Sequence, residues 1–154
     1  MTTNQRSLSA HRRERGRGQA LVEFSLALIP FLLILMGIFD LGRGVYMNNG
    51  VNQAAREIAR TTAVHPCNTS SCTLGNSSET LATIAAQKGL VPGMQSNSVT
   101  FACTTVSDVV VAGTTCGSGK FVRITVSVPY AAITPLLSMV APTTFVSTAH
   151  VQVP

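Results

Sequence analysis

The four cysteines are the side chains best suited to covalent or metal chemistry. Four residues separate Cys67 from Cys72, and twelve separate Cys103 from Cys116. Each of these pairs closes a short loop, which favours two disulfides, and disulfides indicate an oxidising compartment. A zinc site usually has two-residue spacings such as C-x-x-C, so it fits less well. Free buried thiols are a further alternative, because cysteine is often a small core residue.

The other titratable residues do not form an enzyme signature. The three histidines lie far apart, and none has a partner at metal-ligand spacing. In residues 65–154 the carboxylates are Glu79 and Asp108, which are distant in the sequence. Motifs for a serine nucleophile, a phosphate loop or a zinc protease do not occur. We therefore expect no enzymatic activity, no cofactor and no metal site.

The distribution of charge argues against a nucleic-acid-binding protein. The net charge is +5, but most of the excess lies in residues 1–18. The arginines of this leader are Arg6, Arg12, Arg13, Arg15 and Arg17. A nucleic-acid-binding domain would have its basic face on the folded part, which is almost neutral here. Charged residues make up 11% of the chain, against about 25% in ordinary soluble domains, which indicates a membrane segment or burial in an assembly.

An apolar segment follows the leader. Residues 24–39 contain no charge, and extension to Ala20 gives twenty residues with one carboxylate, Glu23. Twenty helical residues span about 30 Å, the thickness of a bilayer core. A cleaved secretory signal is the alternative, but no Ala-x-Ala site follows the segment. The excess of positive charge before it places the N-terminus in the cytoplasm and the residues after Asp40 outside.

Glu23 is unusual because it is a carboxylate inside an apolar segment. It lies near the cytoplasmic end, so it can extend to the interface. A cut after Gly18 would make Gln19 the new N-terminus and Glu23 the fifth residue. The α-amino group of one chain could then pair with Glu23 of a neighbouring chain, which would offset the burial of both charges and favour ordered assembly. Gly16 is a second possible site, but a cut there would make Glu23 the seventh residue.

The run GQALVEF at residues 18–24 resembles a prepilin processing site of the type IV pilin superfamily. Together with Phe39–Arg43 and Ala54–Arg60, it makes residues 16–64 similar to the TadE-like proteins of tight-adherence (Tad or Flp) pilus systems. The related TadF and TadG proteins share this N-terminal pattern. The resemblance implies a pseudopilin that a prepilin peptidase cuts after Gly18 and that docks through Glu23. It implies as partners other pilin subunits and the assembly platform.

The residues after Asp40 predict a second, amphipathic half of the same helix. Small and apolar residues recur at spacings of three and four up to Val64, and Pro66 should end the helix. Pro30 should kink or locally open the first half. Glycines in the second half either pack closely against neighbours or break the helix; they are Gly42, Gly44 and Gly50. Weak ion pairs are predicted three residues apart, Asp40 with Arg43 and Glu57 with Arg60.

Residues 65–154 predict a small domain packed on this helix. A capping box of Asn76 and Glu79 should open a short helix that ends near Gly89. Its inward side chains should be Leu81, Ile84 and Ala85. Strands are expected at residues 98–106, 109–112, 120–130 and 145–153. In the third of these, Val122, Ile124, Val126 and Val128 should face the core. The apolar segment from Ile133 to Ala141 is too short to span a bilayer, and should be either a buried turn of helix or an exposed contact patch.

The sequence thus predicts an α+β, pilin-like protein in which a long N-terminal helix carries a small disulfide-stapled antiparallel sheet. The expected segments are a cleaved leader at 1–18, a transmembrane helix at 19–39, an amphipathic extension at 40–64 and an extracytoplasmic domain at 65–154. We expect a single-pass protein of the inner membrane, in contact with lipid and not with nucleic acid. The alternative is an unprocessed, membrane-tethered accessory or binding domain of a secretion or pilus machine.

Overall fold

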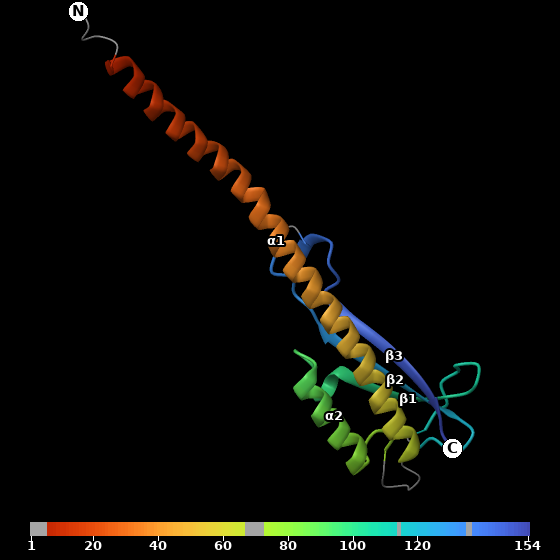
Figure 1. Cartoon of the computed structure of the whole chain (residues 1–154). Coiled ribbons are helices and arrows are strands. Elements are labelled where there is room, and N and C mark those ends of the chain that lie inside the picture. The colour runs from red at the N-terminus through yellow and green to blue at the C-terminus, as the bar shows by residue number, and fades with distance from the viewer. Residues whose placement is uncertain (1–5, 67–72, 114, 135–136) are drawn as a thin grey trace, which may run out of the picture.

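The computed structural model describes residues 6–66, 73–113, 115–134 and 137–154. It is an α+β structure, as predicted: a long helix projects from a small domain built on its C-terminal half (Figure 1). The elements are α1 (Arg6–Val64), α2 (Ser78–Leu90), β1 (Val99–Thr104), β2 (Phe121–Pro129) and β3 (Thr144–Gln152). Short 3-10 turns at Ser96–Ser98 and Leu137–Met139 complete the order of elements.

Helix α1 is continuous over 59 residues. It ends at Val64, as Pro66 predicts, and it is uninterrupted at Pro30 and at the three glycines of its second half. The glycines therefore do not break the helix. The helix begins at Arg6, earlier than the apolar pattern indicates. An apolar pattern shows which residues avoid water, and helical backbone can start before it.

The sheet is antiparallel, in the order β1-β2-β3. The central strand, β2, pairs Val122 with Cys103 of β1 and with Val151 of β3. The side chains that the alternation predicts to face inward are all fully buried, namely Val122, Ile124, Val126 and Val128. Burial of one face of a twisted antiparallel sheet requires this period of two.

The predicted strand at residues 109–112 is wrong. Only an isolated bridge joins Val110 to Thr104. The segment doubles back after β1: Val109 O accepts a hydrogen bond from Thr105 N at 2.9 Å, and Asp108 has a φ of 58°. A left-handed residue in a tight turn ends the extended pairing that the valine run at 109–111 favours.

The core lies between α1 and the inner face of the sheet. Helix α1 contributes Met47, Val51, Ala54, Ala55, Ile58 and Ala59. Alanines on this face let the strands approach the helix backbone closely, while Ile58 fills the space beside them. The C-terminal half of α1 is thus a core helix of the domain.

Helix α2 also packs on α1, but with a different start and a different face from those predicted. Its N-cap is Ser77, whose side chain accepts a hydrogen bond from Thr80 N. Thr80, Ile84 and Gln87 are buried, whereas Leu81 and Ala85 are exposed. The buried hydroxyls of Thr80 and Thr62 lie 3.3 Å apart, and this contact between the helices turns α2 toward its threonine face.

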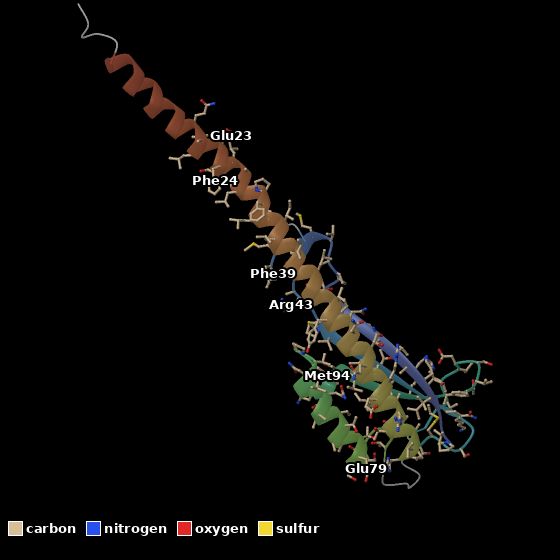
Figure 2. The ribbon with its side chains drawn as sticks, viewed as in Figure 1. Glu23, Phe24, Phe39, Arg43, Glu79 and Met94 are labelled. Atoms are coloured by element: carbon tan, nitrogen blue, oxygen red, sulfur yellow. A yellow bond between two sulfur atoms is a disulfide. The ribbon has the colours of Figure 1, made fainter. Side chains whose placement is uncertain are left out.

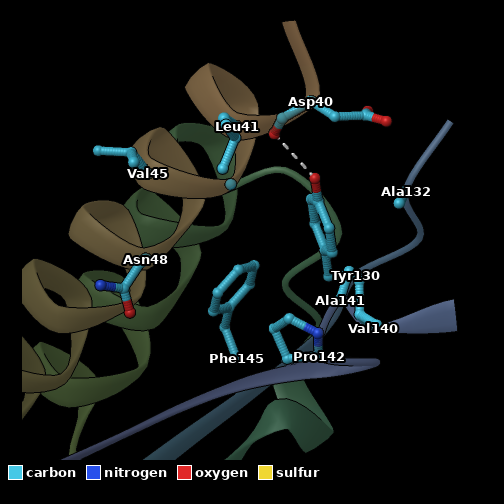
Figure 3. Close-up of a pocket in the computed structure, with 11 residues that line it drawn as sticks. Asp40, Leu41, Val45, Asn48, Tyr130, Ala132, Val140, Ala141, Pro142 and Phe145 are labelled. Carbon is cyan, nitrogen blue, oxygen red and sulfur yellow. Dashed lines mark hydrogen bonds between the residues drawn. The ribbon is translucent and has the colours of Figure 1, made fainter. Parts of the chain in front are cut away.

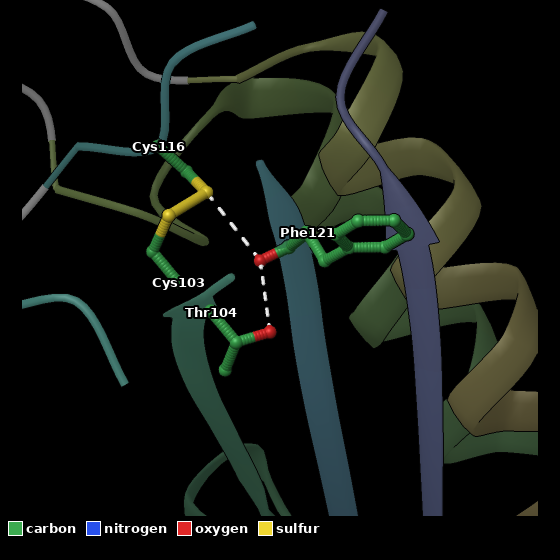
Figure 4. Close-up of a disulfide and its surroundings, with 4 residues drawn as sticks. All are labelled: Cys103, Thr104, Cys116 and Phe121. Carbon is green, nitrogen blue, oxygen red and sulfur yellow. Dashed lines mark hydrogen bonds between the residues drawn. A yellow bond between two sulfur atoms is a disulfide. The ribbon is translucent and has the colours of Figure 1, made fainter. Parts of the chain in front are cut away.

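The disulfide between Cys103 and Cys116 fastens the loop after β1 to the sheet (Figure 4). Both cysteines are buried, and Cys116 Sγ lies 3.5 Å from the carbonyl oxygen of Phe121. The predicted pairing of Cys103 with Cys116 is therefore present. Because both sulfurs are in the disulfide, these two cysteines are neither zinc ligands nor free thiols. The other predicted pair, Cys67 with Cys72, lies outside the residues that the structure describes.

Candidate functional site

The N-terminal half of α1 is an uncovered apolar rod. The helix from Gly18 to Val64 is long and apolar enough to cross a membrane, and none of its most apolar window is buried. Large side chains such as Phe24, Ile34 and Phe39 are exposed. In water such a surface is unfavourable by roughly 25 cal/mol per Å². This half of the helix is therefore suited to lipid or to other apolar helices.

The predicted processing and docking residues all lie on this uncovered rod. Gly18, Gln19 and Glu23 are exposed, and Figure 2 shows Glu23 and Phe24 on the part of α1 that projects beyond the domain. Glu23 forms no hydrogen bond or ion pair with any residue in the described part of the chain. Their predicted roles thus depend on partners outside this chain.

A different site lies where the rod enters the domain. Asp40 follows directly after the predicted span, and only 3% of its surface is exposed. Its carboxylate accepts hydrogen bonds from the backbone N–H groups of Ile133 at 3.1 Å and Thr134 at 2.6 Å. These bonds join the helix to a segment more than ninety residues later in the chain.

The environment of Asp40 holds the pKa of its carboxyl group below the ordinary value of 3.8. The largest cause is the side chain of Thr134, followed by the N–H of the same residue. Burial opposes the shift, while the N–H of Ile133 and the positive charge of Arg43 add to it. Hydrogen-bond donors that face a carboxylate stabilise its charged form, so the turn at 133–134 favours an ionised Asp40.

Aromatic residues complete this junction. The hydroxyl of Tyr130 donates to the Asp40 carbonyl oxygen at 3.0 Å, and Phe145 packs edge-on against the Tyr130 ring at 5.0 Å between centroids. The Arg43 guanidinium lies 5.3 Å from the centre of the same ring and donates to Ala131 O at 3.1 Å. Arg43 therefore packs on the domain by cation–π and hydrogen-bond contacts.

The predicted ion pairs along α1 do not form. Among the described residues, Asp108 forms an ion pair with Arg123 at 3.1 Å, and Nδ1 of His150 lies 3.6 Å from the same carboxylate. Arg123 and His150 are opposite one another on β2 and β3. The carboxylate of Asp40 binds the 133–134 turn instead of Arg43, because buried N–H groups need an acceptor and an exposed i,i+3 pair contributes little.

An apolar groove of about 470 Å³ opens beside this junction (Figure 3). It is lined by Asp40, Leu41, Gly44, Val45, Asn48, Tyr130, Ala132, Val140, Ala141, Pro142 and Phe145. Gly44 packs against the aromatic pair, since a Cβ there would lie in van der Waals contact, 3.6 Å from the Tyr130 hydroxyl oxygen. Gly50 similarly faces Val91, whereas nothing lies near Gly42. Close packing is thus confirmed for two of the three glycines.

The described part of the chain contains no group of three or more His, Cys, Asp or Glu that could hold a metal ion. Asp108 and Arg123 pair their charges on the outer face of the sheet. The arrangement offers surfaces for packing, and its polar groups position elements of the fold.

Most of α1 is similar to a known protein family. The model described as TadE-like protein matches residues 18–60. This segment is TadE-like. The TadE-like match begins at the predicted processing glycine, contains Glu23, Asp40 and Arg43, and ends within α1. It confirms the predicted resemblance for this helix. No curated protein matches the chain, and no solved structure does.

Proposed function

We propose that this protein is a minor pilin or pseudopilin that takes part in assembly of a Tad (Flp) type IV pilus. The proposal rests on the uncovered apolar half of α1, in which Glu23 follows Gly18 inside the TadE-like segment. In this proposal, a prepilin peptidase cuts after Gly18, and the mature helix packs with other subunits at the assembly platform. The helix anchors the precursor and then becomes the packing element of an assembly.

The orientation follows from charge and redox chemistry. The arginines before the helix stay in the cytoplasm, and the domain lies on the other side of the inner membrane. The Cys103–Cys116 disulfide supports this side, because disulfides persist in oxidising compartments. The domain is then periplasmic or extracellular and can be part of a surface pilus.

Glu23 gains a partner only after cleavage. The new α-amino group on Gln19 of one subunit pairs with Glu23 of its neighbour in a low-dielectric helix bundle. Either charge alone would be costly to bury in such a bundle. The pair offsets the cost of removing both charges from water. Docking is therefore coupled to processing, since an uncut chain lacks the amine at this depth.

Intact-mass measurement of the membrane-extracted protein tests the proposal. The expected mature mass lacks residues 1–18, and N-terminal sequencing should begin at Gln19. Gly18→Ala should block the cut, while the matched Gly16→Ala should leave it unchanged. A mature protein that keeps residues 1–18 in cells with an active prepilin peptidase would overturn the proposal. That result would favour the alternative, an unprocessed membrane-tethered accessory domain.

A further inference from the structure

Three exposed large apolar side chains lie on the segment between β2 and β3, which Asp40 binds at its start. They are Ile133, Met139 and Val140, which are 69%, 85% and 79% exposed, and we call them the junction patch. These fractions are high for large apolar side chains on a folded domain. Exposed apolar clusters of this kind mark contacts with a partner or a membrane.

The junction patch lies level with the end of the predicted span. The N–H of Ile133 is 3.1 Å from the Asp40 carboxylate, and Asp40 is one residue beyond Phe39. One residue advances a helix by about 1.5 Å. Val140 lines the groove whose α1 wall runs from Asp40 to Asn48, so it lies beside the part of the helix that directly follows the span. A chain inserted through residues 19–39 therefore brings the junction patch to the outer headgroup region.

The polar groups around the patch are suited to this region. The Asp40 carboxylate accepts the N–H groups of Ile133 and Thr134, and the Asp40 carbonyl accepts the Tyr130 hydroxyl. Backbone donors without partners are costly where water is scarce. Residues 124–149 contain no Asp, Glu, Lys, Arg or His, and the charged side chains beside them, Asp40 and Arg43, are both bound by this segment. Tyr130 at this height also fits the enrichment of tyrosine at membrane interfaces.

We infer that the junction patch inserts into the outer interface of the bilayer that α1 spans, so that the domain rests on the lipid surface through Ile133, Met139 and Val140. This inference rests on the proposed membrane span of the precursor. Lipid is the occupant because the patch continues the apolar surface of α1 at its exit from the bilayer. Contact with lipid therefore needs no second protein. Asp40 acts as a positioning residue that holds the patch at this depth.

Tryptophan quenching by brominated phospholipid tests the inference directly, since the chain contains no tryptophan. The full chain is reconstituted in phosphatidylcholine vesicles at low protein-to-lipid ratio, as the single-tryptophan variants Met139→Trp and Val140→Trp. Lipids brominated near the headgroup should quench both variants, and the emission should shift to the blue of a water-exposed tryptophan. Two positions guard against a local effect of either substitution.

Two control positions make the outcome decisive. Val106→Trp is a matched control, because Val106 is also highly exposed, at 83%, but lies at the other end of the sheet. It follows Thr104, which pairs with Phe121 at the start of β2, whereas Tyr130 comes after the end of β2. Val106→Trp should show no quenching. Phe31→Trp reports the span and should be quenched by bromines near the bilayer centre. Asp40→Ala should reduce quenching at position 139 and leave quenching at position 31 unchanged.

The alternatives give different results. If Phe31→Trp is quenched but both patch variants remain unquenched, the patch does not touch lipid and the inference is wrong. If the blue shift of the patch variants appears only at high protein-to-lipid ratio and without bromine quenching, the occupant is a second copy of the chain, which also overturns it. An unquenched Phe31→Trp removes the membrane span, and with it both the anchor of the proposed function and this inference.

Discussion

The two halves of α1 share one continuous helix but have opposite surroundings. From Gly18 to Phe39, large side chains such as Phe24 and Ile34 are uncovered. From Met47 to Ala63, the inward face is smaller, rich in alanine, and covered by the sheet and α2. Most of the large apolar side chains of α1 are thus exposed. The difference shows that the described part of the chain covers the second half of the helix and leaves the first half uncovered.

The largest expected effect comes from removal of the Glu23 charge from the uncovered half of α1. Glu23→Ala should abolish or strongly reduce assembly, because the neighbouring α-amino group loses its partner, while membrane insertion and the unfolding free energy of the domain remain unchanged. Pilus counts and a membrane-fraction blot measure the two effects. The matched Glu57→Ala removes a carboxylate from the covered half and should leave assembly normal. Normal piliation of the Glu23→Ala strain would refute the docking role.

A pair of isoleucine truncations compares the two halves directly. Ile58 is fully buried, so Ile58→Ala should lower the unfolding free energy of the domain by about 2–5 kcal/mol. Ile34→Ala removes the same atoms from the uncovered half and should leave that free energy almost unchanged. Denaturant unfolding of the full chain in detergent micelles measures both. Equal losses in the two variants would mean that the halves are not energetically distinct.

The boundary between the halves should be sensitive to acid. Because the folded pKa of Asp40 is depressed, its contribution to stability is fully present above the ordinary value of 3.8 and is lost as pH falls through the lower folded value. Asp40→Asn should therefore be less stable than the native chain near neutral pH and lose less stability on acidification. Thermal unfolding followed from neutral pH to below 3.8 measures the difference.

Glu79 provides the control for this acid effect, since its pKa is also lowered, chiefly by its own backbone N–H. Glu79→Gln should remove a separate part of the acid loss, in α2 and not at the junction. If Asp40→Asn keeps the full acid loss of the native chain, the junction contributes nothing to it.

The smallest expected effect concerns two helix glycines, Gly42 before the covered half and Gly50 within it. Nothing lies near Gly42, so Gly42→Ala should stabilise the helix by up to about 1 kcal/mol through backbone propensity. At Gly50, a Cβ would lie 3.4 Å from Val91, so Gly50→Ala should gain less. Unfolding midpoints of the two variants test this order. A larger gain for Gly50→Ala would mean that the contact with Val91 is not close in solution.

The sequence by itself determined the features that depend on local pattern. Uninterrupted apolar residues specify the uncovered helix, a period of two specifies β2, and Pro66 specifies the end of α1. The motif from Gly18 to Glu23, together with Phe39–Arg43 and Ala54–Arg60, marks the TadE-like segment. Each of these signals lies within a short stretch of chain, so its physics can be evaluated from neighbouring residues.

Only the tertiary structure decided which distant groups meet. The partners of Asp40 are at positions 133 and 134, and local spacing instead pointed to Arg43. The rotation of α2 depends on Thr62 of another helix, and the valines at 109–111 turn away because Asp108 adopts a left-handed backbone. Buried hydrogen-bonding groups must find partners wherever the fold places them, and that requirement overrides local propensity. For that reason the candidate membrane contact at Ile133, Met139 and Val140 becomes visible only when Asp40 holds its segment against the end of the helix.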